Sequence, residues 1–445
     1  MKLKAKMANI FTADIINSYL NQFWRLVSGV GTLILIPLFV TPEVQGFWYT
    51  FQSISALSVF ADLGFTTIIL QFSAHEYAFL HMDSSLKLEG AQEYLERISS
   101  LFRFVIKWTV GVVLVAFPII FAVGYYLFIQ KASSSLWLVP WILYCIGAAI
   151  GFVDSILASF IQGCDQVSKI QRYYFLTAIV NTVVLFLSLF LHLGLLSIAL
   201  AILVSNLFNL VLITGQYRNL IGTLLRTKGG NTNWKTEVFG LLWKYALSWA
   251  SGYFIFQIYT PLMFQFHGPI EAGKVGISMS MVTAMFNLSS IWLNANNPKF
   301  NMMVSKKAWA DLDKEFRKDL YLSLGTYILG VLCLVLVVLG LSGRVSAFDK
   351  IVTRFLAPLP ISMLVVGWFL QIPISGMALY LRAHKREPYV LPSMVSGLYI
   401  ATTTFFCGKY LNSSLFFLGF LTSFVFGLPW TFLIFKKAHV IWHSN

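Results

Sequence analysis

The segment that decides the fold is residues 14–40, which read DIINSYLNQFWRLVSGVGTLILIPLFV. Most of the segment is apolar, and it exceeds the roughly 20 residues that a helix needs to cross a bilayer. Its polar side chains recur at steps of three or four, which return to the same face of an α-helix. This first polar row consists of Asn17, Asn21, Arg25, Ser28 and Thr32. The segment therefore predicts a membrane-spanning helix with one polar stripe.

Arg25 is the charged member of the first polar row. A guanidinium at membrane depth costs a few kcal/mol or more unless it faces a cavity or a partner, so such a residue favours a functional role. The alternative is that Arg25 snorkels to the lipid headgroups, since it lies roughly 10 Å from the cytoplasmic end at about 1.5 Å per residue. The four uncharged members of the row favour a water-filled cavity, because snorkelling does not explain them.

The composition is that of a polytopic membrane protein. The chain has 445 residues, of which 58% are hydrophobic and only 11% are charged, unlike a soluble globular protein. The net charge of +14 would suggest nucleic acid in a soluble chain, but here the basic residues lie in short loops between apolar segments. That pattern indicates membrane topology and no nucleic-acid partner. The four cysteines are scattered without metal-ligand spacing, so neither a metal site nor another cofactor is expected.

Twelve apolar segments of about membrane length follow one another along the chain. Their centres lie near Gly29, Val59, Phe117, Ile150, Leu185, Leu203, Phe254, Met285, Leu332, Phe369, Ile400 and Phe424. An even number of spans places both termini on one side of the membrane. Most of the 32 Lys and Arg residues lie in the termini and the even-numbered loops, so both termini are expected in the cytoplasm.

The spans divide into two sets of six. The predicted parts are an N-terminal half at residues 1–217, a cytoplasmic linker at 218–236 and a C-terminal half at 237–445. One internal echo supports a repeat: Gly151, Lys169 and Tyr173 recur at identical spacing as Gly367, Lys385 and Tyr389. The predicted fold is an all-α membrane protein of twelve transmembrane helices, in two six-helix halves around a central cavity.

The eighth span carries a second polar stripe. Its members step by three or four residues and are Ser280, Thr283, Asn287, Ser290, Asn294 and Asn297. Such residues also join helices inside membrane bundles. Three asparagines on one stripe favour a water-filled lumen, in which Asn287 and Asn294 are candidate substrate contacts.

Three other charged residues lie within predicted spans. Lys244 is about two turns from the cytoplasmic end of the seventh span, so it either faces the lumen or snorkels. Asp62 in the second span either pairs with Arg25 or carries a proton or Na⁺. Asp154 in the fourth span follows Gly147 and Gly151, a pair of small residues that allows close helix approach.

The sequence offers no equipment for catalysis. It has no Ser-His-acid arrangement, no glycine-rich phosphate loop and no Cys/His ligand spacing. The outer loops are too short for an extracytoplasmic domain. A polar cavity with modest positive charge is typical of a transporter rather than an enzyme.

Several short motifs resemble one family. They are Trp24-Arg25-Leu26, Pro37-Leu38, Gly46-Phe47-Trp48, Ala61-Asp62-Leu63-Gly64-Phe65, Ile161-Gln162-Gly163, Ala272-Gly273-Lys274-Val275-Gly276 and Asn297-Pro298. Together they resemble motifs of the bacterial O-antigen and exopolysaccharide flippases. One departure is the eighth span, where some relatives carry arginines and this chain has amides and hydroxyls.

The resemblance implies the fold of the multidrug, oligosaccharidyl-lipid and polysaccharide exporter superfamily. It implies a flippase of the inner membrane that moves undecaprenyl-diphosphate-linked oligosaccharide to the periplasmic leaflet by alternating access, coupled to H⁺ or Na⁺, with other polysaccharide assembly proteins as partners. Arg25 and Lys244 would hold the diphosphate, beside Asn17, Asn21 and Ser28. The alternatives are a cation-coupled multidrug exporter that uses Asp62 and Asp154, or a membrane polysaccharide polymerase or glycosyltransferase.

Overall fold

A computed structural model describes residues 2–228, 233–384 and 386–443, and it leaves the side chains of residues 2–19 and most of 239–249 undescribed. The chain forms two compact units. The first comprises Met1–Val40 and Ile54–Ala250, and the second comprises Thr41–Ser53 and Ser251–Asn445. The predicted division into halves at residues 218–236 stays a prediction, because these units follow packing rather than chain order.

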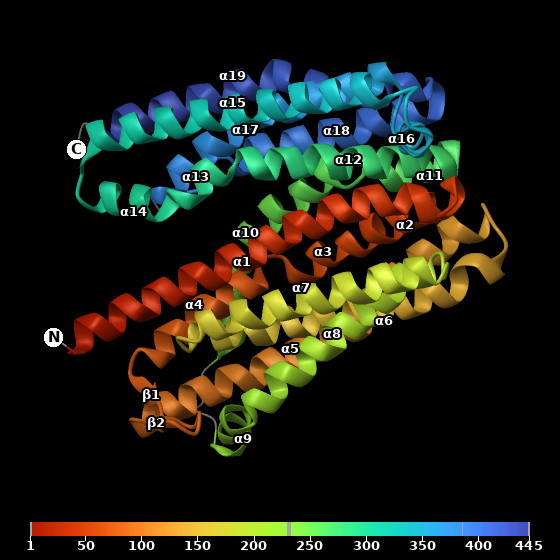
Figure 1. Cartoon of the computed structure of the whole chain (residues 1–445). Helices are drawn as coiled ribbons and strands as arrows, with labels where there is room; N and C mark the ends of the chain where they lie inside the picture. Colours follow the sequence, from red (N-terminus) through yellow and green to blue (C-terminus); the bar gives the residue numbers. More distant parts are fainter. Residues whose placement is uncertain (1, 229–232, 385, 444–445) are drawn as a thin grey trace. The chain divides into compact units, whose positions relative to one another are not determined.

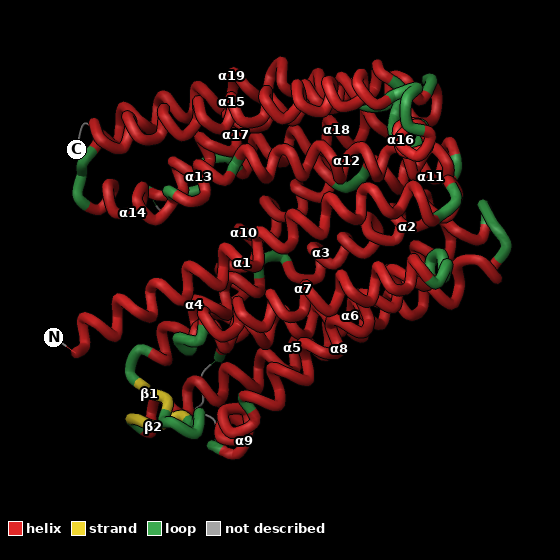
Figure 2. Tube along the Cα trace, in the orientation of Figure 1, coloured by secondary structure: helices red, strands yellow, loops and turns green. Residues whose placement is uncertain are grey.

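The first unit consists of long helices and one small hairpin (Figures 1 and 2). Its elements are α1 (Lys2–Phe39), the short 3₁₀ turn Ala56–Ser58, α3 (Val59–Asp62), α4 (Phe65–Tyr77), β1 (Leu80–Met82), β2 (Leu88–Gly90), α5 (Gln92–Ile129), α6 (Ser134–Gly163), α7 (Val167–Phe190), α8 (Leu196–Gln216), α9 (Arg218–Arg226) and most of α10 (Trp234–Phe256).

The second unit is entirely helical in the part that the structure describes. It contains most of α2 (Pro42–Ser55), the end of α10, α11 (Tyr259–His267), α12 (Pro269–Ser289), α13 (Ile291–Ala295), α14 (Asn297–Ser305), α15 (Trp309–Leu341), α16 (Ser346–Val352), α17 (Pro358–Ala383), α18 (Val390–Tyr410), the 3₁₀ turn Ser413–Leu415 and α19 (Leu418–His443).

The helices confirm the predicted class of all-α membrane protein. Within the described residues, nine helices are long and apolar enough to cross a membrane, and the bent pair Pro42–Asp62 and Phe65–Tyr77 makes up to ten. Each of the twelve predicted centres lies in a helix. Ten of these centres lie in the spans just named, and the other two lie in α10 and α12. These two helices carry charged and small polar residues, which lower their hydropathy.

The first helix is longer than the sequence indicated. We expected it to begin at Asp14, but α1 begins at Lys2. Residues 2–13 contain neither glycine nor proline, and they include the strong helix formers Lys, Ala and Met, so nothing in this stretch stops the helix.

The predicted second span is broken at Leu63 and Gly64. Both residues adopt left-handed backbone conformations, with φ of 48° and 83°, and the helices on either side differ in direction by 44°. The Asp62 carboxylate caps the N-terminus of α4. It accepts hydrogen bonds from the Gly64 N–H at 3.2 Å, the Thr66 N–H at 3.1 Å and the Thr66 hydroxyl at 3.0 Å. Asp62 is thus a helix cap in this structure.

A glycine seam joins residues 41–53 to α12 inside the second unit. A Cβ on Gly46 would lie 1.9 Å from the Pro269 carbonyl oxygen, and one on Gly276 would lie 2.2 Å from the Tyr49 Cβ. The buried Gln45 side chain donates to the Gly273 carbonyl at 2.9 Å. Only glycine at positions 46 and 276 permits this backbone approach.

The hairpin of the first unit pairs β1 with β2 in antiparallel register, Leu80 opposite Gly90 and Met82 opposite Leu88. Asp83 holds its turn by accepting from the Ser85 hydroxyl at 2.7 Å and the Lys87 N–H at 2.7 Å. These bonds stabilise the carboxylate and lower the pKa of Asp83.

Candidate functional site

The first polar row lies on one face of α1, as its spacing predicted. The Arg25 Nε donates to the Asn21 Oδ1 at 3.1 Å, one helical turn away. The Ser28 hydroxyl donates to the Arg25 carbonyl at 3.2 Å, and the Thr32 hydroxyl donates to the Ser28 carbonyl at 2.8 Å. Among the members of the row with described side chains, Asn21 and Arg25 are therefore the ones that do not bond back to the backbone of α1.

The face of α1 that carries Asn21 packs on α7. Asn21, only 7% exposed, donates from Nδ2 to the Gln171 Oε1 at 3.4 Å. The Trp24 indole donates to the Thr182 hydroxyl at 3.2 Å and meets the Phe175 ring edge-on at 6.4 Å. Asn21 is thus fixed between Arg25 and α7, and it fixes the guanidinium in turn.

The Arg25 guanidinium is exposed, and among the described residues it forms no salt bridge with a carboxylate. A guanidinium has five N–H donors. Asn21 accepts the single side-chain hydrogen bond that the structure shows from Arg25. The remaining donors can therefore serve an anionic ligand.

A polar core lies behind Arg25 in the first unit. Asp154 on α6 is 3% exposed, and neither of its carboxylate oxygens has a hydrogen-bond partner in the described part of the chain. Tyr174 on α7 lies near both Asp154 and Arg25. The Asn209 amide lies beside Asp154 outside hydrogen-bond geometry and accepts from the Thr177 hydroxyl at 3.1 Å. A carboxyl group held in this way is suited to taking up a proton or a small cation.

Close approach of α6 and α8 creates this core. A Cβ on Gly147 would lie 2.8 Å from the Leu203 backbone nitrogen, and one on Gly151 would lie 2.5 Å from the Asn206 Nδ2. The Asn206 amide donates to the Gly147 carbonyl at 2.9 Å. The predicted role of these two glycines in close helix packing is confirmed.

The other predicted residues lie on several different helices. Asn287 on α12 and Asn294 on α13 are exposed, but α12 ends at Ser289, so the stripe of the eighth span does not follow one straight helix. The side chains of Asn17 and Lys244 lie outside the described residues. Asp62 caps α4, and no described salt bridge joins it to Arg25. Its predicted role in ion coupling stays a prediction, as do the roles of the others.

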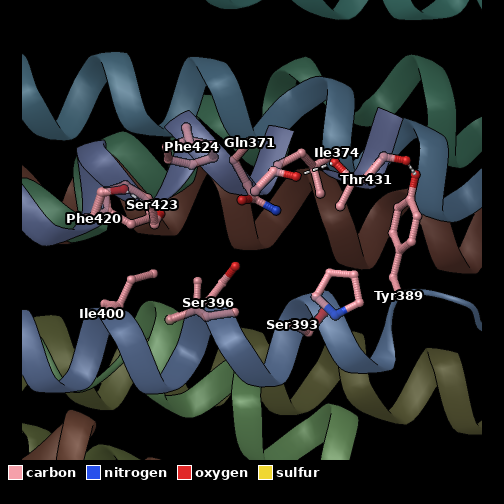
Figure 3. Close-up of a pocket in the computed structure, with 13 residues that line it drawn as sticks. Gln371, Ile374, Tyr389, Ser393, Ser396, Ile400, Phe420, Ser423, Phe424 and Thr431 are labelled. Carbon is pink, nitrogen blue, oxygen red and sulfur yellow. Dashed lines mark hydrogen bonds between the residues drawn. The ribbon is translucent and has the colours of Figure 1, made fainter. Parts of the chain in front are cut away.

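A pocket in the second unit was not expected from the sequence (Figure 3). It has a volume of about 60 Å³ and lies where α17, α18 and α19 meet Ile255 of α10. Its polar lining includes Gln371, Ser393, Ser396 and Ser423. The only signal for it was the internal echo, since Tyr389 also lines the pocket and stands at the repeat position of Tyr173.

No protein-family model matches the chain, and no curated protein matches its sequence. Its structure, however, is similar to solved transporters. One is an inward-facing multidrug resistance MATE family transporter of the MOP superfamily, at 12% identity, with 96% of this chain and 98% of that chain covered and a TM-score of 0.64.

Two further structures agree. The MATE multidrug transporter DinF-BH, solved as a complex, shares 12% identity, with 96% and 95% of the two chains covered and a TM-score of 0.59. A MATE protein in complex with MaL6 shares 11% identity, with 96% of each chain covered and a TM-score of 0.54. The chain therefore has the fold of the MATE transporters of the MOP superfamily.

Proposed function

We propose that this protein is a flippase that moves a polyprenyl-diphosphate-linked oligosaccharide across the inner membrane by alternating access, with both chain termini in the cytoplasm. The observation that carries the proposal is the exposed Arg25 guanidinium on a membrane-spanning helix, fixed by Asn21 and without a carboxylate partner in the described chain. A membrane protein keeps such a cation only where an anion or water meets it.

A lipid diphosphate has the chemistry that Arg25 would bind. The planar guanidinium offers parallel N–H groups that match a pair of phosphate oxygens, whereas an ammonium offers a point charge. Lys244 would add a second cation. The exposed amides of Asn287 and Asn294 suit the neutral hydroxyl groups of a glycan, because amides both donate and accept hydrogen bonds.

An ion gradient can supply the free energy for transport against a gradient. Asp154 is the candidate, since it is buried, its carboxylate oxygens have no hydrogen-bond partner in the described structure, and Tyr174 lies near both Asp154 and Arg25. We propose that binding of H⁺ or Na⁺ at Asp154 neutralises its carboxylate and so changes the electrostatic potential at Arg25. Other proteins of polysaccharide assembly would supply the substrate and take the product.

Surface polysaccharide in a deletion strain tests the proposal. Without the protein, surface glycan should be lost and lipid-linked precursor should accumulate inside, where its mass spectrum identifies the headgroup. Complementation with Arg25→Ala or Arg25→Gln should fail at equal membrane abundance, and Arg25→Lys should retain partial activity, since a point charge in a low-dielectric site still attracts an anion. Normal surface glycan in the deletion strain would refute the flippase function. Full activity of Arg25→Gln would refute the role of Arg25.

A cation-coupled multidrug exporter is the second candidate. The buried carboxylate of Asp154 favours it, and the similar structures include multidrug transporters. Raised sensitivity of the deletion strain to cationic dyes, together with normal surface polysaccharide, would select this function over the first.

A further inference from the structure

The pocket of the second unit has a lining without charge. Among its described lining residues there is no Asp, Glu, Lys, Arg or His. An ion bound at membrane depth without a partner of opposite charge costs several kcal/mol. The lining therefore selects a neutral ligand over a cationic drug or a phosphate.

The pocket offers both hydrogen-bond acceptors and donors. The Ser423 hydroxyl donates to the Phe420 carbonyl at 2.6 Å, and the Tyr389 hydroxyl donates to the Thr431 carbonyl at 2.8 Å (Figure 3). The Gln371 amide donates to the Ser375 hydroxyl at 3.3 Å. The hydroxyl oxygens and the Gln371 carbonyl oxygen can accept hydrogen bonds, while the second Gln371 amide hydrogen and the hydroxyls of Ser393 and Ser396 can donate them. The pocket therefore suits a ligand whose O–H groups both donate and accept.

An apolar wall completes the pocket. Phe420 and Phe424 meet edge-on, with ring centroids 5.4 Å apart, and both line the space together with Ile400. Ligand sites commonly combine such a wall with a few placed polar groups. A volume of about 60 Å³ holds several water-sized groups, at about 10–15 Å³ each. The space suits part of one ring and is too small for an oligosaccharide.

We propose that this pocket binds one edge of a neutral sugar ring through its hydroxyl groups, as a subsite for the glycan. A pyranose has the required chemistry, because its hydroxyl groups donate hydrogen bonds while its C–H faces are apolar. The inference rests on the proposed function and assigns the class of sugar that the site accepts: uncharged rings rather than uronic acids or amino sugars with a free ammonium.

A matched pair of glycine substitutions tests the subsite. A Cβ on Gly427 of α19, which lines the pocket, would lie 3.6 Å from the Ser396 Oγ, an ordinary contact that occupies pocket space. A Cβ on Gly325 of α15 would meet nothing within 4 Å. Gly427→Ala and Gly325→Ala change intrinsic helix propensity equally, so they differ in whether the methyl group enters the pocket. Ser396→Val, which removes a lining hydroxyl and adds bulk, is an independent second variant.

Purified protein would be titrated with neutral methyl glycosides and read by tryptophan fluorescence, because Trp368 lies 6.4 Å from the Phe420 ring. Wild type and Gly325→Ala should show saturable binding. Gly427→Ala and Ser396→Val should weaken it about tenfold or more, the effect of losing roughly one good contact. Absence of glycoside binding to wild type, equal binding by Gly427→Ala and Gly325→Ala, or stronger binding of tetraphenylphosphonium in this pocket would each overturn the inference.

The same variants separate this inference from the proposed function. Loss of surface glycan in the deletion strain, with no glycoside binding to the purified wild type, overturns the subsite and leaves the flippase. Pocket-dependent glycoside binding by a protein whose deletion leaves surface glycan normal supports the subsite and overturns the flippase.

Discussion

Replacing Gly46 by alanine should destabilise the second unit, because the new methyl group has no space. It would lie 1.9 Å from the Pro269 carbonyl oxygen, 2.4 Å from its carbonyl carbon and 2.8 Å from its Cα. Non-bonded carbon contacts are favourable only near 3.5–4.0 Å. The backbones must therefore separate by about 1.5 Å, and backbone cannot rotate away as a flexible side chain can.

The expected cost follows from the contacts that this separation breaks. Overpacking a core costs about 1–3 kcal/mol and sometimes more, and a clash with backbone belongs at the upper end. The shift also stretches the buried bond from Gln45 to the Gly273 carbonyl, now 2.9 Å, which adds about 1 kcal/mol. Better helix propensity offsets up to about 1 kcal/mol. The net destabilisation should be about 3 kcal/mol.

Thermal unfolding of the detergent-purified protein measures the effect. The control is Gly111→Ala in α5, where a Cβ meets nothing within 4 Å, so its midpoint should equal or slightly exceed that of the wild type. Gly46→Ala should unfold at a clearly lower temperature. Equal midpoints for the two variants would refute the close approach of residues 41–53 to α12.

Two other predictions concern titratable groups. Asp154→Asn should keep the protein folded, since it removes an unpaired buried carboxyl group, but should abolish the dependence of transport on an imposed H⁺ or Na⁺ gradient; unchanged gradient dependence in vesicles would contradict the coupling role. Burial chiefly lowers the pKa of His384, against opposing effects of the Tyr380 carbonyl and Asp313, so the unfolded chain takes up its proton first as pH falls. The stability that His384 contributes is therefore present above about pH 6.5 and is lost as pH falls below it. His384→Gln should reduce the fall in unfolding midpoint between about pH 7 and 5. An unaltered pH profile would exclude this contribution.

The spans could be predicted from the sequence because the bilayer fixes both the length and the composition of a helix that crosses it. All twelve predicted centres lie in helices for that reason. The break at Leu63 and Gly64 was readable in part. Asp62, Gly64 and Thr66 form a pattern typical of a helix cap, with an acceptor side chain before a glycine. The left-handed backbone of Leu63 carried no signal, because tertiary packing imposes it.

The candidate site, too, could be predicted only in part from the sequence. The hydrogen bond between Arg25 and Asn21 follows from helical spacing alone, so the sequence could predict it. Gln171, Tyr174 and Asp154 reach the same region from α6 and α7, more than a hundred residues away along the chain. No periodicity within one segment reports such contacts. Packing between helices decides them, and here the glycines of α6 set how closely α8 approaches.

The internal echo relates the region around Asp154 in the first unit to the pocket of the second unit. Gly151 and Tyr173 of the first unit correspond in spacing to Gly367 and Tyr389 of the second. Asp154 stands three residues after Gly151, whereas Leu370 stands three residues after Gly367. The two repeats therefore differ at this position. The first repeat has the Asp154 carboxylate, whereas the corresponding helices of the second unit line a neutral pocket. Ion coupling at Asp154 and binding of an uncharged ring in the pocket are therefore compatible. The ion needs the Asp154 carboxylate, whereas the uncharged ring needs only the neutral polar groups of the pocket.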